Sequence, residues 1–140
     1  MSEPLLLLDT HVWIWLLNGE ARLRNTAALA AIEKAVPLAA LRLSAISLWE
    51  IGMLEAKGRL SLPMDCLSWT TEALSAPGLS LLPLSAEIAI TSSHLPGQFH
   101  GDPADRLIVA SARAHNATLV TADKGILAYG KQGHVRVLKV

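Results

Sequence analysis

Short strand-like segments rich in apolar residues, which alternate with helical segments, constrain this fold more than any other feature. The first run, Leu5–Leu8, is continuous and ends at Asp9. Continuous apolar runs of this length are typical of strands buried on both faces, as in parallel sheets. Further strand candidates lie at Leu41–Ile46, Leu79–Leu82, Ala117–Thr121 and Val135–Leu138.

Segments of helical composition separate these runs. The expected helices are Thr10–Leu17, Ala21–Ala35, Ser47–Lys57, Asp65–Ala76, Ala86–Ser93, Ala104–His115 and a short helix that ends at Gly130. We expect Ser47 to cap its helix, because Glu50 follows at the spacing of a capping box. Strands that alternate with helices predict an α/β fold with a parallel sheet and helices on both faces.

Composition limits the class of protein. The 140 residues suit one domain, 1–140, and the 51% hydrophobic and 17% charged content argues against disorder. Lys plus Arg equals Asp plus Glu at 12 each, so no bulk positive charge attracts nucleic acid. One cysteine and no apolar stretch long enough for a membrane helix predict a cytoplasmic protein without membrane contact. The surplus of apolar residues predicts a surface covered by a partner or a second copy.

Five acidic residues are expected at one edge of the sheet. Asp9 follows the first strand and Asp123 follows the fourth. Glu50 lies early in the helix after the second strand, and Asp102 and Asp105 flank the start of a later helix. Open parallel sheets bind ligands outside the carboxyl ends of their strands, so this edge is the candidate site.

Grouped carboxylates require compensation. Two carboxylates about 5 Å apart repel by roughly 3 kcal/mol at an effective dielectric of 20, so a group persists when protons or a cation offset the charge. Oxygen ligands favour Mg²⁺ or Mn²⁺, which can activate water and clamp a phosphodiester. The alternative is a set of separate carboxylates that are solvated or favoured by helix N-termini. If the acids converge, the pattern predicts phosphodiester hydrolysis.

Four segments, in order, resemble the motifs of PIN-domain proteins, in particular of the VapC toxin branch. They are Leu7–His11, Ser47–Ile51 with Gly58–Leu60, His100–Ala110 and Leu119–Asp123. The resemblance spans residues 5 to about 128. It implies a three-layer α/β/α sandwich around a short central parallel sheet. It also implies an endoribonuclease toxin that depends on Mg²⁺ or Mn²⁺ and cleaves RNA. Such toxins are held inactive by a cognate VapB-like antitoxin, so we expect a homodimer or a toxin–antitoxin hetero-oligomer.

The resemblance also assigns site residues. Carried over by motif, Asp9, Glu50, Asp105 and Asp123 are the catalytic acids and metal ligands. Asp102 is a possible ligand in place of Asp105, which we favour because it directly precedes the apolar part of its helix.

Several neighbours could support these acids. Thr10 and Thr121 could hydrogen-bond a carboxylate or a metal-bound water, or could be ordinary strand-end or helix-cap residues. Arg106 could neutralise the site or contact phosphate, or form a surface ion pair. His11 could act as a general base, although a metal-bound water needs none. Four tryptophans could stack on RNA or pack in the core or an interface: Trp13, Trp15, Trp49 and Trp69.

Two other functions compete with the nuclease. A non-catalytic PIN-fold interaction module would keep the fold without needing the acids. A phosphoacceptor receiver-like domain also uses acids and Mg²⁺ at strand ends. However, it needs paired acids after its first strand, where this chain has Asp9-Thr10-His11.

Overall fold

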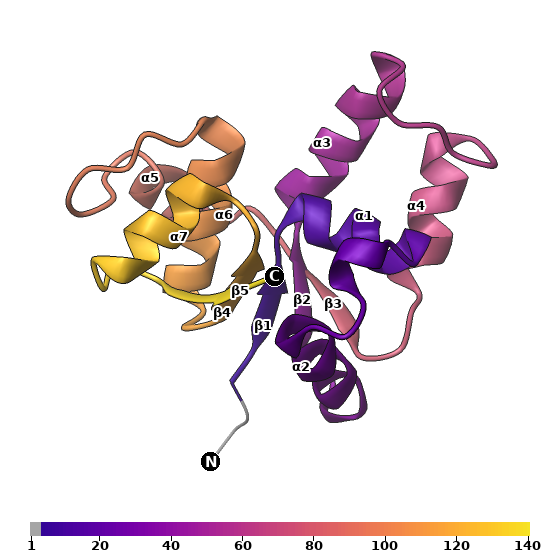
Figure 1. The fold of residues 1–140 in the computed structure, drawn as a ribbon. Helices are drawn as coiled ribbons and strands as arrows, with labels where there is room; N and C mark the ends of the chain where they lie inside the picture. Colours follow the sequence, from indigo (N-terminus) through magenta and orange to yellow (C-terminus); the bar gives the residue numbers. More distant parts are fainter. Residues whose placement is uncertain (1–3) are drawn as a thin grey trace.

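The computed structural model describes residues 4–140, and within them five strands form one parallel sheet of order β3-β2-β1-β4-β5 (Figure 1). The strands are β1 (Leu6–Leu8), β2 (Leu41–Ser44), β3 (Leu79–Leu82), β4 (Thr118–Thr121) and β5 (Arg136–Lys139). Every neighbouring pair runs parallel. The prediction of a short central parallel sheet is therefore confirmed.

Helices cover both faces of the sheet, which confirms the α/β/α layering. They are α1 (Thr10–Asn18), α2 (Ala27–Ala35), α3 (Ala45–Ala56), α4 (Cys66–Leu74), α5 (Ala86–Thr91), α6 (Pro103–Ala114) and α7 (Lys124–Lys131). In Figure 1, α1 and α2 lie on one side of the strands, and α6 and α7 on the other. Helix α3 contacts α1, α4 and α6. No helix within residues 4–140 is long and apolar enough to cross a membrane.

The alternation of side chains along the central strands produces two apolar cores. Leu7 pairs with Leu119, and both are fully buried in the core beneath α6 and α7. Leu8 pairs with Leu43 and Val120, and all three are fully buried in the core beneath α1 and α2. Each such side chain contributes roughly 1.5–3 kcal/mol through burial, so the central strands provide a rigid base for the residues that follow them.

The helix predicted over Ala21–Ala35 is wrong in its first part. The structure has a 3₁₀ turn at Ala21–Leu23, and then Asn25 with a left-handed φ of 57°. Helix α2 begins only after Thr26, whose hydroxyl caps it. A threonine hydroxyl that accepts a free backbone N–H favours a helix start over a continuous helix, and Thr26 has this role here.

The prediction that Ser47 caps its helix is also wrong. Strand β2 ends at Ser44, and the Ser44 hydroxyl accepts the N–H of Ile46, so the cap of α3 lies three residues earlier than expected. Ser47 and Glu50 therefore lie inside α3 and form no capping box. This shift places Glu50 on the second turn, from which its side chain reaches α1 instead of its own backbone.

Candidate metal-binding active site

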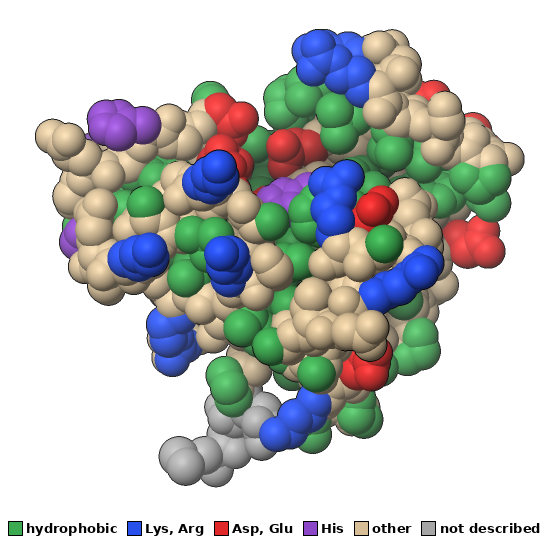
Figure 2. Space-filling model, in the orientation of Figure 1, with side chains coloured by type: hydrophobic (Ala, Val, Ile, Leu, Met, Phe, Trp, Pro, Cys, Tyr) green, Lys and Arg blue, Asp and Glu red, His purple; other side chains and the backbone are tan. Residues whose placement is uncertain are grey.

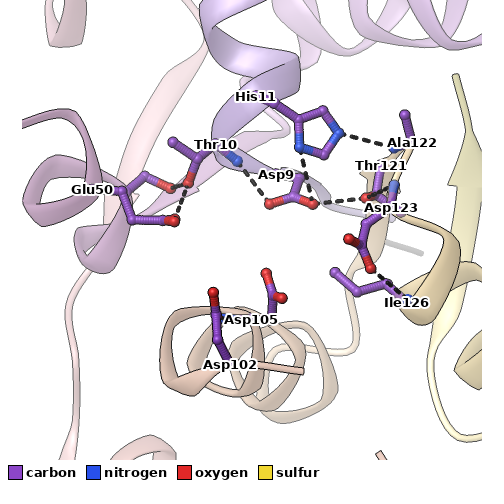
Figure 3. A network of polar contacts seen from close by, with 11 residues as sticks. Asp9, Thr10, His11, Glu50, Asp102, Asp105, Thr121, Ala122, Asp123 and Ile126 are labelled. Carbon is purple, nitrogen blue, oxygen red and sulfur yellow. Dashed lines mark hydrogen bonds and ion pairs between the residues drawn. The ribbon is translucent and has the colours of Figure 1, made fainter. Parts of the chain in front are cut away.

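Asp9 lies at the carboxyl end of the central strand β1 and is only 3% exposed. Its Oδ1 accepts the N–H of Thr10 at 2.9 Å, and its Oδ2 accepts the Thr121 hydroxyl at 2.7 Å (Figure 3). The Nδ1 atom of His11 lies 3.5 Å from the same Oδ2. Both carboxylate oxygens are thus held in place by groups from β4 and the start of α1.

Opposing effects set the charge on Asp9. Burial is the largest and raises the pKa of its carboxyl above the ordinary value, while Asp123 adds a smaller rise. His11 and the hydrogen bonds from Thr121 and Thr10 lower it. Burial is the stronger effect, so the carboxylate lacks full compensation from the protein, and a cation beside it would favour the ionised form.

Glu50 is hydrogen-bonded to the side chain of Thr10 at the start of α1. The Thr10 hydroxyl donates to Glu50 Oε1 at 2.5 Å and lies 2.7 Å from the Ser47 hydroxyl. Because Thr10 has a single hydroxyl hydrogen, Ser47 is the donor in the second contact. Burial raises the pKa of Glu50, and Thr10 opposes that rise. The structure thus gives Thr10 the role of orienting a carboxylate, and Ser47 is a site residue that the motif analysis missed.

Asp102 and Asp105 lie together at the start of α6 but are bound differently. Asp102 is exposed, and its Oδ1 accepts the N–H of Asp105 at 2.8 Å, so it caps the helix. Asp105 is half-buried and extends toward Asp9 and Asp123 in Figure 3. Burial, followed by the negative charges of the other four acids, raises the pKa of Asp105 to about 7, and no hydrogen bond from the described part of the chain opposes this rise.

Asp123 and Asp9 are linked through a buried threonine. Thr121 is fully buried, and its hydroxyl donates to Asp9 while accepting the N–H of Asp123 at 3.0 Å. Asp123 caps α7, because its Oδ2 accepts the N–H of Ile126 at 2.9 Å. A single hydroxyl at the end of β4 therefore fixes the spacing between two acids from different strands.

His11 has a structural role that sequence reasoning missed. Its Nε2 accepts the N–H of Ala122 at 3.0 Å, so the ring hydrogen is on Nδ1, which faces Asp9. With that lone pair occupied, the structure does not favour His11 as a general base. The ring also packs at 4.9 Å against Trp15 and ties α1 to the turn between β4 and α7. No sequence spacing pointed to this contact, because 111 residues separate the partners.

The structure does not bring Arg106 into the acidic group. Its guanidinium donates to the carbonyls of Ser92 at 2.9 Å and Phe99 at 2.6 Å. Within residues 4–140 it forms no ion pair, so neither a neutralising contact nor a surface salt bridge is observed. Arg106 instead anchors the segment before α6, which positions Asp102 and Asp105.

The acidic side chains fit a hydrated divalent cation. Their donors are all oxygens, the ligands that Mg²⁺ and Mn²⁺ prefer. Figure 2 shows acidic side chains gathered around the hollow at the upper centre of the molecule. Within residues 4–140, no three His, Cys, Asp or Glu side chains form a ready-made ligand group. Mg²⁺ usually keeps several waters and is bound through one or two carboxylates, so it does not require an all-protein cage.

Comparison with known proteins agrees with this geometry. The PIN domain family model matches residues 6–132. Ribonuclease VapC22 of Mycobacterium tuberculosis (strain ATCC 25618 / H37Rv) is 39% identical over 118 residues, which cover 84% of this chain and 86% of that protein.

Two solved structures share the fold. The DNA-bound VapBC of Salmonella typhimurium superposes with a TM-score of 0.69 at 15% identity over 98% of both chains. The promoter-bound VapBC2 of Rickettsia felis superposes with a TM-score of 0.65 at 20% identity, over 96% of this chain and 98% of that chain. The family match over most of the chain, together with the VapC relative, shows that this protein belongs to the PIN-domain family, as its four motifs predicted.

Proposed function

We propose that this chain is a metal-dependent endoribonuclease, the toxin of a VapBC-type toxin–antitoxin pair, which hydrolyses RNA phosphodiester bonds in the cytoplasm. The observation that carries the proposal is the meeting of Asp9, Asp105 and Asp123 at one edge of the sheet, where Asp9 and Asp123 raise the pKa of Asp105 and Asp123 raises the pKa of Asp9. No Lys or Arg within residues 4–140 forms an ion pair with these three acids. Similarity to Ribonuclease VapC22 supports RNA as the substrate.

The chain's own residues would prepare the site for this reaction. Asp9, Glu50, Asp105 and Asp123 would hold Mg²⁺ or Mn²⁺, with Asp102 capping α6. A cation there supplies positive charge for the phosphate oxygens and makes water a better nucleophile. Thr121 and Thr10 hold the carboxylates of Asp9 and Glu50 in fixed orientations. Without that positive charge the acids repel a phosphodiester, so substrate binding and reaction both depend on the cation.

A cognate VapB-like antitoxin is the proposed partner. The superposed structures from Salmonella typhimurium and Rickettsia felis are VapBC complexes, which supports this assignment. Among the tryptophans, Trp13 is 1% exposed and packs against Trp69, so it belongs to the core. Trp49 on α3 is 58% exposed and Leu67 on α4 is 78% exposed, so these helices offer apolar surface to an antitoxin or a second copy.

Cleavage of a mixed pool of structured RNAs tests the enzymatic part of the proposal. The purified, antitoxin-free protein is assayed with Mg²⁺, with Mn²⁺ and with EDTA, alongside Asp9→Asn. The matched control is Asp65→Asn: Asp65 caps α4 away from the site, and Asn caps helices equally well. We expect cleavage with metal and in the control, none in EDTA, and at least about a 100-fold loss in Asp9→Asn.

Each other outcome has a definite meaning. A fully active Asp9→Asn variant would overturn the site, and cleavage that persists in EDTA would overturn metal dependence. Folded protein that cuts no RNA would favour the non-catalytic interaction module. Transfer of phosphate from a small phosphodonor would identify a receiver-like domain, an alternative weakened by the PIN-domain match.

A further inference from the structure

A cleft of about 390 Å³ lies between the segment before α6 and the helix α7. Asp105, Asp123, Gln98 and Gln132 line it, and Asp123 caps the start of α7 whereas Gln132 follows its end, so the lining runs from one end of that helix to the other. Its volume lies within the range of roughly 300–1,000 Å³ that is usual for ligand sites. We call this space the base cleft, defined by these four residues together with Ala128.

Small residues on α7 keep the base cleft open. Gly125, Ala128 and Gln132 line it and follow one another at intervals of three and four, which places them on one face of the helix. The first two carry no side chain beyond Cβ, so this wall of the cleft is low near the acids. A single larger residue at position 128 would reduce this space while leaving every acid in place.

Two buried and mutually packed aromatic residues form part of the cleft lining. Phe99 and Tyr129 line it, both are buried, and their ring centroids lie 4.9 Å apart. The Tyr129 hydroxyl donates to the carbonyl of Pro96, which ties α7 to the segment before α6. At Gly101 a Cβ would come within 2.5 Å of the Phe99 ring. The two walls are therefore held together, and the cleft is a preformed feature of the fold.

The chemistry of the lining suits a nucleobase better than a phosphate. The lining, which also includes His100 and Asp102, contains no Lys or Arg, the side chains that usually bind backbone phosphates. Gln98 and Gln132 are exposed, and each amide offers both a donor and an acceptor. Sequence-specific RNA recognition uses such groups to hydrogen-bond the edges of unstacked bases.

We propose that the base cleft receives the base of a nucleotide adjacent to the scissile phosphate, and that Gln98 and Gln132 determine which base is accepted. This inference rests on the proposed ribonuclease function. The acidic end would take the phosphate together with its cation, and the amide end would read the base. The cleft and the acids form one continuous space, so a phosphate and its neighbouring base can occupy both ends at once.

The test uses a filled cleft and a matched control. Ala128→Leu places an apolar side chain in the cleft, and Leu is a good helix former, so α7 is retained. The control, Ala30→Leu, makes the same change at an exposed position on α2, on the opposite face of the sheet. Gln98→Ala and Gln132→Ala remove the amides separately. Each protein is tested on short RNAs that differ only in the base beside the cleavage site.

We expect wild type and Ala30→Leu to prefer the same base. Ala128→Leu should raise KM about tenfold or more, and each Gln→Ala variant should weaken discrimination between bases by roughly 5- to 100-fold. Titration with Mn²⁺ should give the same affinity for all five proteins, because no acid is changed. Wild-type base preference in all three cleft variants would overturn the base cleft and leave the nuclease standing.

Binding provides a readout that does not depend on cleavage. The four ribonucleoside monophosphates are titrated into wild type, Ala128→Leu and Ala30→Leu with Mn²⁺ present. Binding that differs among the four bases and is lost only in Ala128→Leu supports the base cleft even if no RNA is cut. Absence of binding to the wild type, or equal binding to Ala128→Leu, overturns it.

Discussion

The acidic residues of the site are held differently near β1 and near the start of α6. On the side of β1 and α3, Asp9 and Glu50 each accept a hydrogen bond from a threonine hydroxyl, and Asp9 is almost fully buried. On the side of α6, Asp105 receives no hydrogen bond from residues 4–140 that would offset its burial and its charged neighbours. The fold therefore fixes the orientation of the first pair through hydrogen bonds that partly oppose the rise in their pKa values, whereas the rise in the pKa of Asp105 is opposed by no such contact among the described residues.

This difference suggests a division of labour. A carboxylate held by buried hydroxyls supplies a fixed point around which a site can assemble, because its orientation is set before any ligand arrives. A carboxylate with a pKa of about 7 holds a proton near neutral pH that a cation can displace. Asp9 would thus define where the cation binds, and Asp105 would couple that binding to pH.

The largest expected effect comes from Asp105→Asn. We expect cleavage to fall at least about 100-fold, because a proposed metal ligand is lost. Without metal at pH 8, the same variant should be more stable than wild type by on the order of 1 kcal/mol, or about 4 °C in Tm, because a repelled charge is removed. Thermal unfolding without Mn²⁺ measures this gain in stability, and thermal unfolding with Mn²⁺ measures the stabilisation by metal. Asp65→Asn is the control. If Asp105→Asn were instead less stable than wild type without metal, the charge of Asp105 would not destabilise the folded protein.

The next effect should come from Thr121→Val, which removes the hydroxyl between Asp9 and Asp123 while keeping the side-chain shape. We expect metal affinity and cleavage to fall roughly 10- to 100-fold, as is usual when the group that orients a metal ligand is lost. Mn²⁺ titration measures the affinity, with Thr71→Val on the exposed face of α4 as control. If the loss matches that of the control, Asp9 does not depend on Thr121 for its orientation.

A smaller effect is the dependence of metal-free stability on pH. The pKa of Asp105 is raised from 3.8 to about 7 on folding, so the folded state binds the extra proton. The resulting stability is fully present below pH 3.8 and is lost as pH rises to about 7. Wild-type Tm should therefore decrease from pH 5 to pH 8 relative to Asp105→Asn, and Mn²⁺ should restore it at pH 8. Parallel pH profiles for the two proteins would contradict this assignment.

The sequence predicted the positions of the acids better than their surroundings. Asp9 and Asp123 follow apolar runs, and parallel strands place such residues at one edge, so this grouping followed from topology alone. Ser47 was assigned a capping role because its spacing to Glu50 fits a local motif. In the structure, Ser44 ends β2 first, and Ser47 contacts α1 instead. Local patterns reveal contacts along one helix, whereas contacts between helices depend on the packed structure.

The same limit applies to His11 and Arg106. Both lie next to acids in the sequence, which suggested catalytic or charge-neutralising roles. Their hydrogen bonds instead reach Ala122 and the segment before α6, far along the chain or away from the acids. Proximity in sequence therefore predicted that they belong near the site, and only the folded arrangement showed that they support it.

The smallest expected effect distinguishes Asp102 from Asp105 as the third ligand. Asp102 is exposed, and its carboxylate already caps α6, a role that Asn fills equally well. Asp102→Asn should therefore keep cleavage within about threefold of wild type, whereas Asp102→Ala should cost about 1 kcal/mol of stability through loss of the cap. Cleavage rates and thermal unfolding of both variants separate the two contributions. If Asp102→Asn instead lost cleavage as completely as Asp105→Asn, both carboxylates at the start of α6 would bind the cation. The acids at the start of α6 would then contribute as much to metal binding as Asp9, which follows β1.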